Sequence, residues 1–143
     1  MAAGLERFVE AQREVWTQAL AELRAGRKRS HWMWFIFPQV AGLGHSETAR
    51  FYAIDGIAEA RAYLAQPLLG QRLADASAAL LAHAGRIDAE ALLGGIDAVK
   101  LWSSMTLFEA AADGEGRAPF SAVLDAFYAG ARDPATLQRL APS

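Results

Sequence analysis

Apolar residues recur every three or four positions along most of the chain, which is the spacing of helices that bury one face. The helices that this spacing predicts cover residues 5–25, 47–54, 57–65, 68–83, 88–93, 97–112, 119–128 and 134–140. We find no strong alternation of apolar and polar residues, which half-buried strands would require. The sequence therefore predicts an all-α protein, a compact single-domain bundle over residues 1–143 with about six to eight helices and short loops.

The predicted helix ends coincide with residues that cap or break helices. Gly26 suits the left-handed conformation that closes a helix, and Pro67 cannot continue the helix before it. Ser46 and Asp97 stand where a side-chain oxygen can accept a hydrogen bond from the first helical turn. Asp133, which a proline follows, marks the start of the last helix.

The segment from Ser30 to Gln39 departs from the helical spacing. It reads Ser-His-Trp-Met-Trp-Phe-Ile-Phe-Pro-Gln, with no polar residue between His31 and Gln39. A run that is apolar on every side must be buried on every side, and residues 34–37 are predicted to be extended. His31 and Gln39 then either find partners in the core or lie at the rim of a cavity.

The composition narrows the classes of protein and of site. With 53% hydrophobic and 21% charged residues, the chain is globular rather than disordered. It has no cysteine, and its three histidines lack the spacing of a zinc motif, so we expect neither a metal nor a cofactor. A net charge of −2 argues against a nucleic-acid partner, because nucleic acid favours a basic surface.

Two further features concern location. The first residues lack the basic region and long apolar core of a signal peptide. No apolar run approaches the roughly 20 residues that a membrane span needs. We therefore expect a cytoplasmic protein that does not associate with a membrane.

The residues in and after the aromatic run that are candidates for a ligand site are His31, Trp32, Trp34, Gln39, His45 and Ser46. Indole faces can stack a base, a nicotinamide or a sugar, and the amide of Gln39 can both donate and accept hydrogen bonds. Residues 42–46 lead into a predicted helix whose free N–H groups can hold a phosphate or a carboxylate. Alternatively, the rings form the core, His31 is a structural residue, and His45 and Ser46 form only a turn and a helix cap.

The helix that Asp97 is predicted to cap carries further candidates, namely Lys100, Ser103 and Ser104. Asp97, Lys100 and Ser104 share one helix face because they are three and four residues apart. A buried Lys100 could act as the base for a serine nucleophile, or it could hold an anion. The alternative is that Lys100 extends to water and the small serines let helices approach closely.

The decapeptide at residues 30–39 also belongs to a series of motifs, which continues at residues 42–46, 52–54, 59–64, 67–73, 97–108, 120–128 and 133–137. Together these segments resemble the bacterial family known as domain of unknown function 1810, some members of which carry the label calpastatin. The resemblance implies an all-α fold and no defined activity. A looser similarity to bacterial N-glycosidases that act on ADP-ribose-linked substrates aligns no catalytic residue.

We interpret the chain as a protein with one ligand pocket between the aromatic run, residues 42–46 and the helix of Lys100. The expected ligand is aromatic and anionic, such as a nucleotide or an ADP-ribose-like molecule. Whether the protein is an enzyme stays open, and the reaction that we consider is metal-independent hydrolysis of a glycosidic or phosphate-linked bond. The alternative is a non-catalytic interaction or structural module with the aromatic run as its core.

Overall fold

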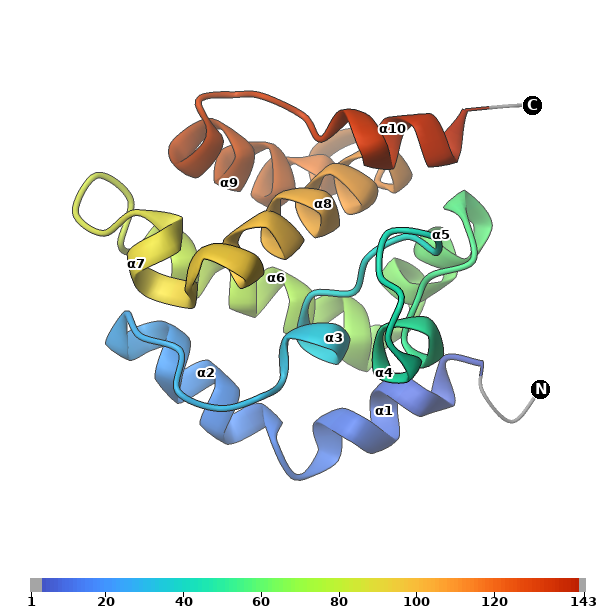
Figure 1. The fold of residues 1–143 in the computed structure, drawn as a ribbon, viewed down its shortest axis with the longest axis horizontal. Coiled ribbons are helices and arrows are strands. Elements are labelled where there is room, and N and C mark those ends of the chain that lie inside the picture. The colour runs from blue at the N-terminus through green and yellow to red at the C-terminus, as the bar shows by residue number, and fades with distance from the viewer. Residues whose placement is uncertain (1–3, 142–143) are drawn as a thin grey trace.

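Helices form nearly all of the regular structure (Figure 1). The computed structural model describes residues 4–141, and ten α-helices and one 3-10 helix lie within them. They are α1 (Glu6–Arg13), α2 (Trp16–Ala25), α3 (Met33–Ile36), α4 (Glu47–Phe51), α5 (Ile57–Ala65), α6 (Pro67–Leu81), α7 (Ala89–Leu93), α8 (Gly95–Ala111), η1 (Gly114–Arg117), α9 (Ala118–Tyr128) and α10 (Pro134–Leu140). The prediction of an all-α fold is confirmed. The predicted domain also included residues 1–3 and 142–143, which lie outside the described residues.

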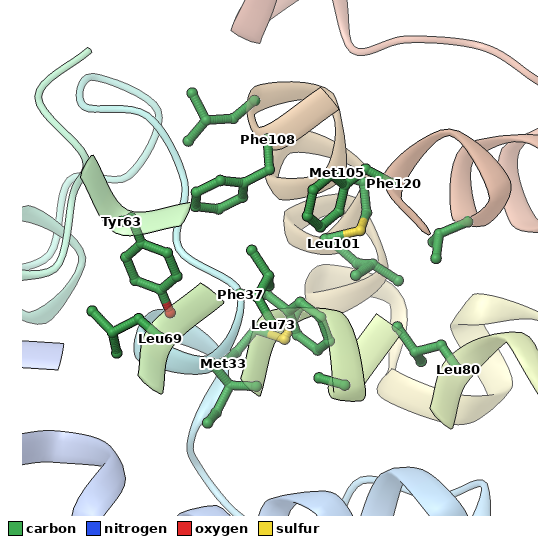
Figure 2. Packing of buried hydrophobic residues seen from close by; sticks show 14 of the residues in the cluster. Met33, Phe37, Tyr63, Leu69, Leu73, Leu80, Leu101, Met105, Phe108 and Phe120 are labelled. Carbon is green, nitrogen blue, oxygen red and sulfur yellow. The ribbon is translucent and has the colours of Figure 1, made fainter. Parts of the chain in front are cut away.

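Helix α8 is the centre of the packing. It contacts α5, α7, α9 and α10, and α6 contacts α2, α5 and α9. In Figure 1, α8 lies between α6 and the pair formed by α9 and α10. Among the buried side chains drawn in Figure 2, the Phe108 ring lies 5.2 Å from that of Tyr63 and 6.0 Å from that of Phe120, measured between ring centroids. Helices α1–α3 and α5–α9 all contribute to this buried cluster, and its removal of apolar surface from water is the main stabilising term.

The first predicted helix, residues 5–25, is wrong as a single element. In the structure α1 ends at Arg13 and α2 begins at Trp16, and the two helices meet at an angle (Figure 1). The helical spacing of apolar residues continues across the break, so the sequence gives no sign of it. The cause lies in tertiary packing, because α1 packs mainly against α3 whereas α2 packs against α6.

Most of the predicted helix ends are confirmed. Gly26 has a φ of 82° and closes α2, and the hydroxyl of Ser46 accepts a hydrogen bond from the Ala49 N–H at the start of α4. Asp133 caps α10 in the same way. The prediction that Asp97 caps its helix is wrong, because α8 already begins at Gly95 and Asp97 lies in its first turn.

The aromatic run is not extended, so this prediction is also wrong. Residues 33–36 form the single turn of α3, which sends successive side chains in different directions. Trp32 and Met33 point into the core, whereas Trp34 and Phe35 are only half-buried. The run therefore has an exposed face, which burial on every side would have excluded.

The described residues also bear on membranes and metals. No helix within residues 4–141 is both long enough and apolar enough to cross a bilayer. Over the same residues, the side chains of His, Asp and Glu nowhere gather in a group of three that could hold a metal ion.

Candidate functional site

A buried carboxylate positions the beginning of the aromatic run. Glu22, near the end of α2, accepts hydrogen bonds from the Arg29 N–H (2.7 Å), the Ser30 N–H (3.0 Å), the Trp32 indole (2.9 Å) and the Gln18 amide (3.0 Å), and also from the Ser30 hydroxyl. Burial alone would raise the pKa of Glu22, but these donors together lower it from 4.5 to about 2. The ionised carboxylate therefore fixes both the loop after α2 and the Trp32 ring.

Two lysines join this loop to α8. Lys28 Nζ lies 3.0 Å from Asp97 Oδ2, and Lys100 Nζ lies 3.7 Å from Asp97 Oδ1. Each ammonium also faces an indole ring, Lys28 at 5.1 Å from the centroid of Trp32 and Lys100 at 5.3 Å from that of Trp34. These distances are in the range of cation–π attraction. The aromatic run and α8 thus meet, and two positive charges share one negative charge at their junction.

Trp34 also lines an open groove of about 410 Å³, which we call the Trp34 groove. Its remaining lining residues come from α3, α4 and the residue after α4, and they are Phe35, Glu47, Thr48, Phe51 and Tyr52. Phe51 is 51% exposed, and its ring meets the Tyr52 ring edge to face at 4.8 Å. The rings of Trp34, Phe35 and Tyr52 are half-buried, and a partly exposed aromatic group of this kind is a common feature of ligand sites and interaction surfaces.

A buried amide supports one wall of the Trp34 groove. Gln12 of α1 is 1% exposed and donates to the Phe35 carbonyl at 2.7 Å and to the Tyr63 hydroxyl at 3.1 Å. The Gln12 carbonyl oxygen accepts from Arg72 at 3.4 Å. Burial raises the pKa of Tyr63, which therefore stays protonated. The backbone beneath Phe35 is thus held from inside the molecule.

A buried guanidinium supports the other wall. Arg7 of α1 donates to the carbonyls of Phe51 and Ala53, at 2.7 Å in both cases, and pairs with Glu59 at 3.2 Å. Burial would raise the pKa of Glu59, but the hydrogen bonds from Arg7 and from the Asp55 N–H lower it. The end of α4 is therefore held by charge-assisted bonds, and the exposed ring of Phe51 stands on fixed backbone.

The structure brings together only some of the residues that the sequence singled out. Trp34 and Lys100 are neighbours, and Trp32 lies behind them in the core. His31 is exposed, and Gln39 is half-buried, with its main-chain carbonyl accepting from the Ile54 N–H. Neither His31 nor Gln39 lines the Trp34 groove.

His45 and Ser46 are exposed and precede α4. The Ser46 hydroxyl accepts a hydrogen bond from the helix it caps, at 3.1 Å from the Ala49 nitrogen. Neither residue lines the Trp34 groove, although α4 itself does. Their contribution to the groove is therefore to begin the helix that carries Phe51.

The two serines of α8 lie inside the molecule. The Ser103 hydroxyl donates to Asp133 Oδ2 at 2.6 Å, and Thr136 donates to the same oxygen at 2.7 Å, which ties α10 to α8. Ser104 is fully buried, and its hydroxyl has no hydrogen-bond partner among the described residues. Neither hydroxyl is exposed to a dissolved substrate, and Asp133 rather than Lys100 is the polar side chain bonded to Ser103.

Several residues at the site were missed by the sequence analysis. Lys28 had a weak signal, because it belongs to the basic cluster after the first helix and is one of only two lysines among the 14 basic residues. The structure shows that both lysines meet at Asp97. Phe51 and Tyr52 form an adjacent aromatic pair, which is a weaker signal. Gln12 falls within the apolar stripe of the first predicted helix, four residues after Phe8, which was a signal of burial. Arg7 had none, because a polar residue on an amphipathic helix is normally assigned to its exposed face.

With the fold and this site described, the chain can be compared with known proteins. Residues 2–140 match the sequence model of the family described as Protein of unknown function (DUF1810), and the chain belongs to this family. Its structure is similar to the crystal structure of the conserved hypothetical protein Rv1873 from Mycobacterium tuberculosis, with a TM-score of 0.92 and 44% sequence identity over 97% of each chain. No curated protein matches the sequence.

Proposed function

We propose that the protein binds an anionic aromatic small molecule, such as a nucleotide or an ADP-ribose-like compound, in the Trp34 groove. One observation carries the proposal: the Trp34 ring borders both an open aromatic groove and the ammonium of Lys100. A ligand with a flat ring and a nearby negative charge matches this pair of features. The proposal keeps the ligand class and the aromatic run that the sequence suggested, and it replaces residues 42–46 with α4 as the second wall.

The chemistry of the lining residues, and of Lys100 beside Trp34, suggests a role for each part of such a ligand. The rings of Trp34 and Phe51 offer flat faces for a base, and stacking of this kind contributes roughly 1–3 kcal/mol per base. The Lys100 side chain is 25% exposed, so an anion can approach its ammonium. Glu47 can accept hydrogen bonds from sugar hydroxyls, and Thr48 can donate one.

The proposal is for binding and not for hydrolysis. The hydroxyls considered as nucleophiles, Ser103 and Ser104, are buried away from the groove. Among the residues that line the groove, Glu47 is the one carboxylate, whereas glycoside hydrolysis usually uses two that converge on the bond. The observations therefore favour a protein that holds its ligand without breaking it.

The test is a titration of the 15N-labelled protein, followed by NMR, with adenosine, AMP and ADP-ribose. We expect shifts at Trp34 and Phe51 with all three compounds and tighter binding of the two phosphorylated ones. Lys100→Gln should weaken AMP and ADP-ribose by about tenfold, which is the size of one charge contact, and should leave adenosine unchanged. Phe51→Ser should weaken all three.

Leu137→Ser is the control variant, because Leu137 is another exposed apolar residue, at 45%, and lies on α10 outside the groove. It should bind every compound as the unchanged protein does. The proposal is abandoned if none of the three compounds shifts a groove resonance at millimolar concentration, or if Leu137→Ser weakens binding as much as Phe51→Ser does.

The second candidate function, a protein-interaction module, is favoured by a different surface. Ile96 is 78% exposed and Val99 is 57% exposed, one helical turn apart on α8. Isolated apolar residues of this exposure are common, so the pair by itself defines no partner. A concentration-dependent change in sedimentation that Ile96→Asp abolishes would support this function; an unchanged monomer would count against a self-association surface.

A further inference from the structure

A separate pocket of about 420 Å³ lies where the carboxyl end of α8 meets α5, α6 and α9. Its apolar lining includes Leu64 of α5, Ala74 of α6, Ala111 of α8 and Phe120 of α9. None of its residues lines the Trp34 groove. The volume falls within the roughly 300–1,000 Å³ that small-molecule sites occupy, so the pocket can enclose a small apolar group.

Small residues and close helix packing account for this space. Ala74 and Ala111 present only methyl groups to the pocket, in positions where larger side chains would fill it. Gly70, also in the lining, lets α5 and α6 approach closely, because a Cβ there would lie 2.3 Å from the Leu64 carbonyl oxygen. The walls are therefore helix backbone and methyl groups held by the fold, which makes the pocket a preformed one.

Charged residues of both signs surround the apolar part of the pocket. Arg61 comes from α5, and Asp113 and Glu115 come from the turn between α8 and α9. All three are exposed, and none of them forms a salt bridge within residues 4–141. Opposite charges thus line one pocket without neutralising each other, which leaves each of them available to a ligand.

We propose that this pocket binds a hydrophobic α-amino acid in its zwitterionic form. The apolar side chain would lie against Leu64 and Phe120, the carboxylate would meet Arg61, and the ammonium would meet Asp113 or Glu115. Arg and carboxylate groups form geometrically specific pairs, and an ammonium takes up several acceptors at once. A neutral hydrocarbon would leave all three charges unused, and a simple anion would meet two carboxylates.

The experiment is an NMR titration of the 15N-labelled chain with L-leucine and L-phenylalanine, and with two analogues. Leucinamide lacks the carboxylate, and N-acetylleucine lacks the ammonium. We expect leucine to shift the resonances of Leu64 and Phe120 and to bind about fivefold or more tighter than either analogue, since each charge contact at an exposed rim is a small one. The tripeptide Leu-Gly-Gly tests whether the pocket binds a peptide amino terminus rather than a free amino acid. We expect it to bind as weakly as leucinamide, because it too lacks a carboxylate next to the leucine ammonium.

Variants test which charged residues of the pocket contact the carboxylate and the ammonium of the amino acid. Arg61→Gln should weaken leucine about fivefold without weakening leucinamide, which has no carboxylate to lose a partner. The double variant Asp113→Asn and Glu115→Gln should weaken leucine by a similar factor without weakening N-acetylleucine, which has no ammonium. Arg24→Gln is the matched control, because Arg24 is an exposed arginine of α2 outside the pocket and should leave all five affinities unaltered. Circular dichroism establishes that each variant is folded.

Three results would overturn the proposal. The first is the absence of any shift at Leu64 and Phe120 with millimolar leucine or phenylalanine. The second is equal binding of leucine and both analogues, which would show that the charges take no part. The third is a loss of leucine binding in Trp34→Leu, which would place the amino acid in the Trp34 groove instead.

Discussion

Trp32 and Trp34 are separated by one residue, and each ring faces one of the chain's two lysines, yet they stand in different surroundings. Trp32 is fully buried, and its indole N–H is bonded to the carboxylate of Glu22. Trp34 is half-buried and borders an open groove. The two rings divide one aromatic run into a part that holds the fold together and a part that faces solvent.

The two tryptophans show how a buried, fully hydrogen-bonded layer can lie directly behind a partly exposed aromatic surface. The carboxylate behind Trp32 is fully supplied with donors, so this layer leaves no hydrogen-bonding capacity for a ligand. Around Trp34 the polar groups instead support the backbone from below, where Gln12 and Arg7 bind the carbonyls of Phe35 and Phe51. The rings above keep exposed faces, as a preorganised binding surface requires.

The largest expected effect separates the two tryptophans directly. Trp32→Leu should lower the free energy of unfolding by about 3–5 kcal/mol, because it leaves a cavity and removes a donor from a buried carboxylate. Trp34→Leu should cost less than about 1 kcal/mol, because its ring is half-exposed and its ammonium contact is partly solvated. Urea unfolding of both variants measures the difference. Equal costs would contradict the division of the run into a core ring and a surface ring.

Removal of the charge behind Trp32 should have the next largest effect. Glu22→Gln should cost roughly 2–3 kcal/mol, because a neutral amide forms weaker bonds and its NH2 group faces other donors. Glu14→Gln is the control, since Glu14 is exposed at the end of α1 and should change stability by less than about 0.5 kcal/mol. A cost at Glu22 no larger than at Glu14 would show that the buried carboxylate does not hold the loop.

The carboxylate of Glu22 should also make the free energy of unfolding depend on pH. The pKa of Glu22 is lowered from 4.5 in the unfolded chain to about 2 in the folded one. Its contribution is therefore complete above pH 4.5 and is lost as the pH falls toward 2. We expect the stability difference between the unchanged protein and Glu22→Gln to shrink over this interval. A difference that stays constant from neutral pH to pH 2 would refute the lowered pKa.

The sequence predicted the framework better than the geometry of the run. Helical spacing and caps such as Gly26, Ser46 and Asp133 depend on neighbouring residues, and the structure confirms them. The break between α1 and α2 depends on contacts with α3 and α6, which no local pattern records. The single turn of α3 was missed for a different reason. An unbroken apolar run fits a strand and a buried helix equally well, so the sequence does not distinguish them.

At the site, the sequence identified the two segments that meet but not how they meet. Trp34 and Lys100 were both named, and the structure places them together. Ser103 was named for its hydroxyl, yet its partner is Asp133, 30 residues away. Arg7 and Glu59 are 52 residues apart and form the pair beneath the groove. Such pairings depend on the packing of distant helices, so spacing within one helix cannot reveal them.

The adjacent serines of α8 differ in the same way, because the hydroxyl of Ser103 is hydrogen-bonded and that of Ser104 has no partner among the described residues. Ser103→Ala should cost about 1–2 kcal/mol, because it removes a donor from the buried carboxylate of Asp133. Ser104→Ala should be neutral or stabilising, because it removes a buried hydroxyl that has no partner among the described residues. Thermal unfolding of the two variants measures the stability cost of the same change, the loss of one hydroxyl group, at a hydrogen-bonded site and at a site without a partner. A larger cost at Ser104 than at Ser103 would mean that its hydroxyl does have a bonding partner.

The smallest expected effect concerns the lysines that face the two rings. Lys28 is the more buried, with a side chain 10% exposed and an ammonium 3.0 Å from Asp97, whereas Lys100 is 25% exposed and lies 3.7 Å away. Lys28→Met should therefore cost about 1 kcal/mol, and Lys100→Met about 0.5 kcal/mol or less, since methionine keeps most of the packing against each indole. High salt should shrink both costs, because it screens exposed charges more than it affects apolar contact. If Lys100→Met proved the costlier, Lys100 would be a structural residue like Lys28, and the surface beside Trp34 would lose the accessible cation that distinguishes it from the core beside Trp32.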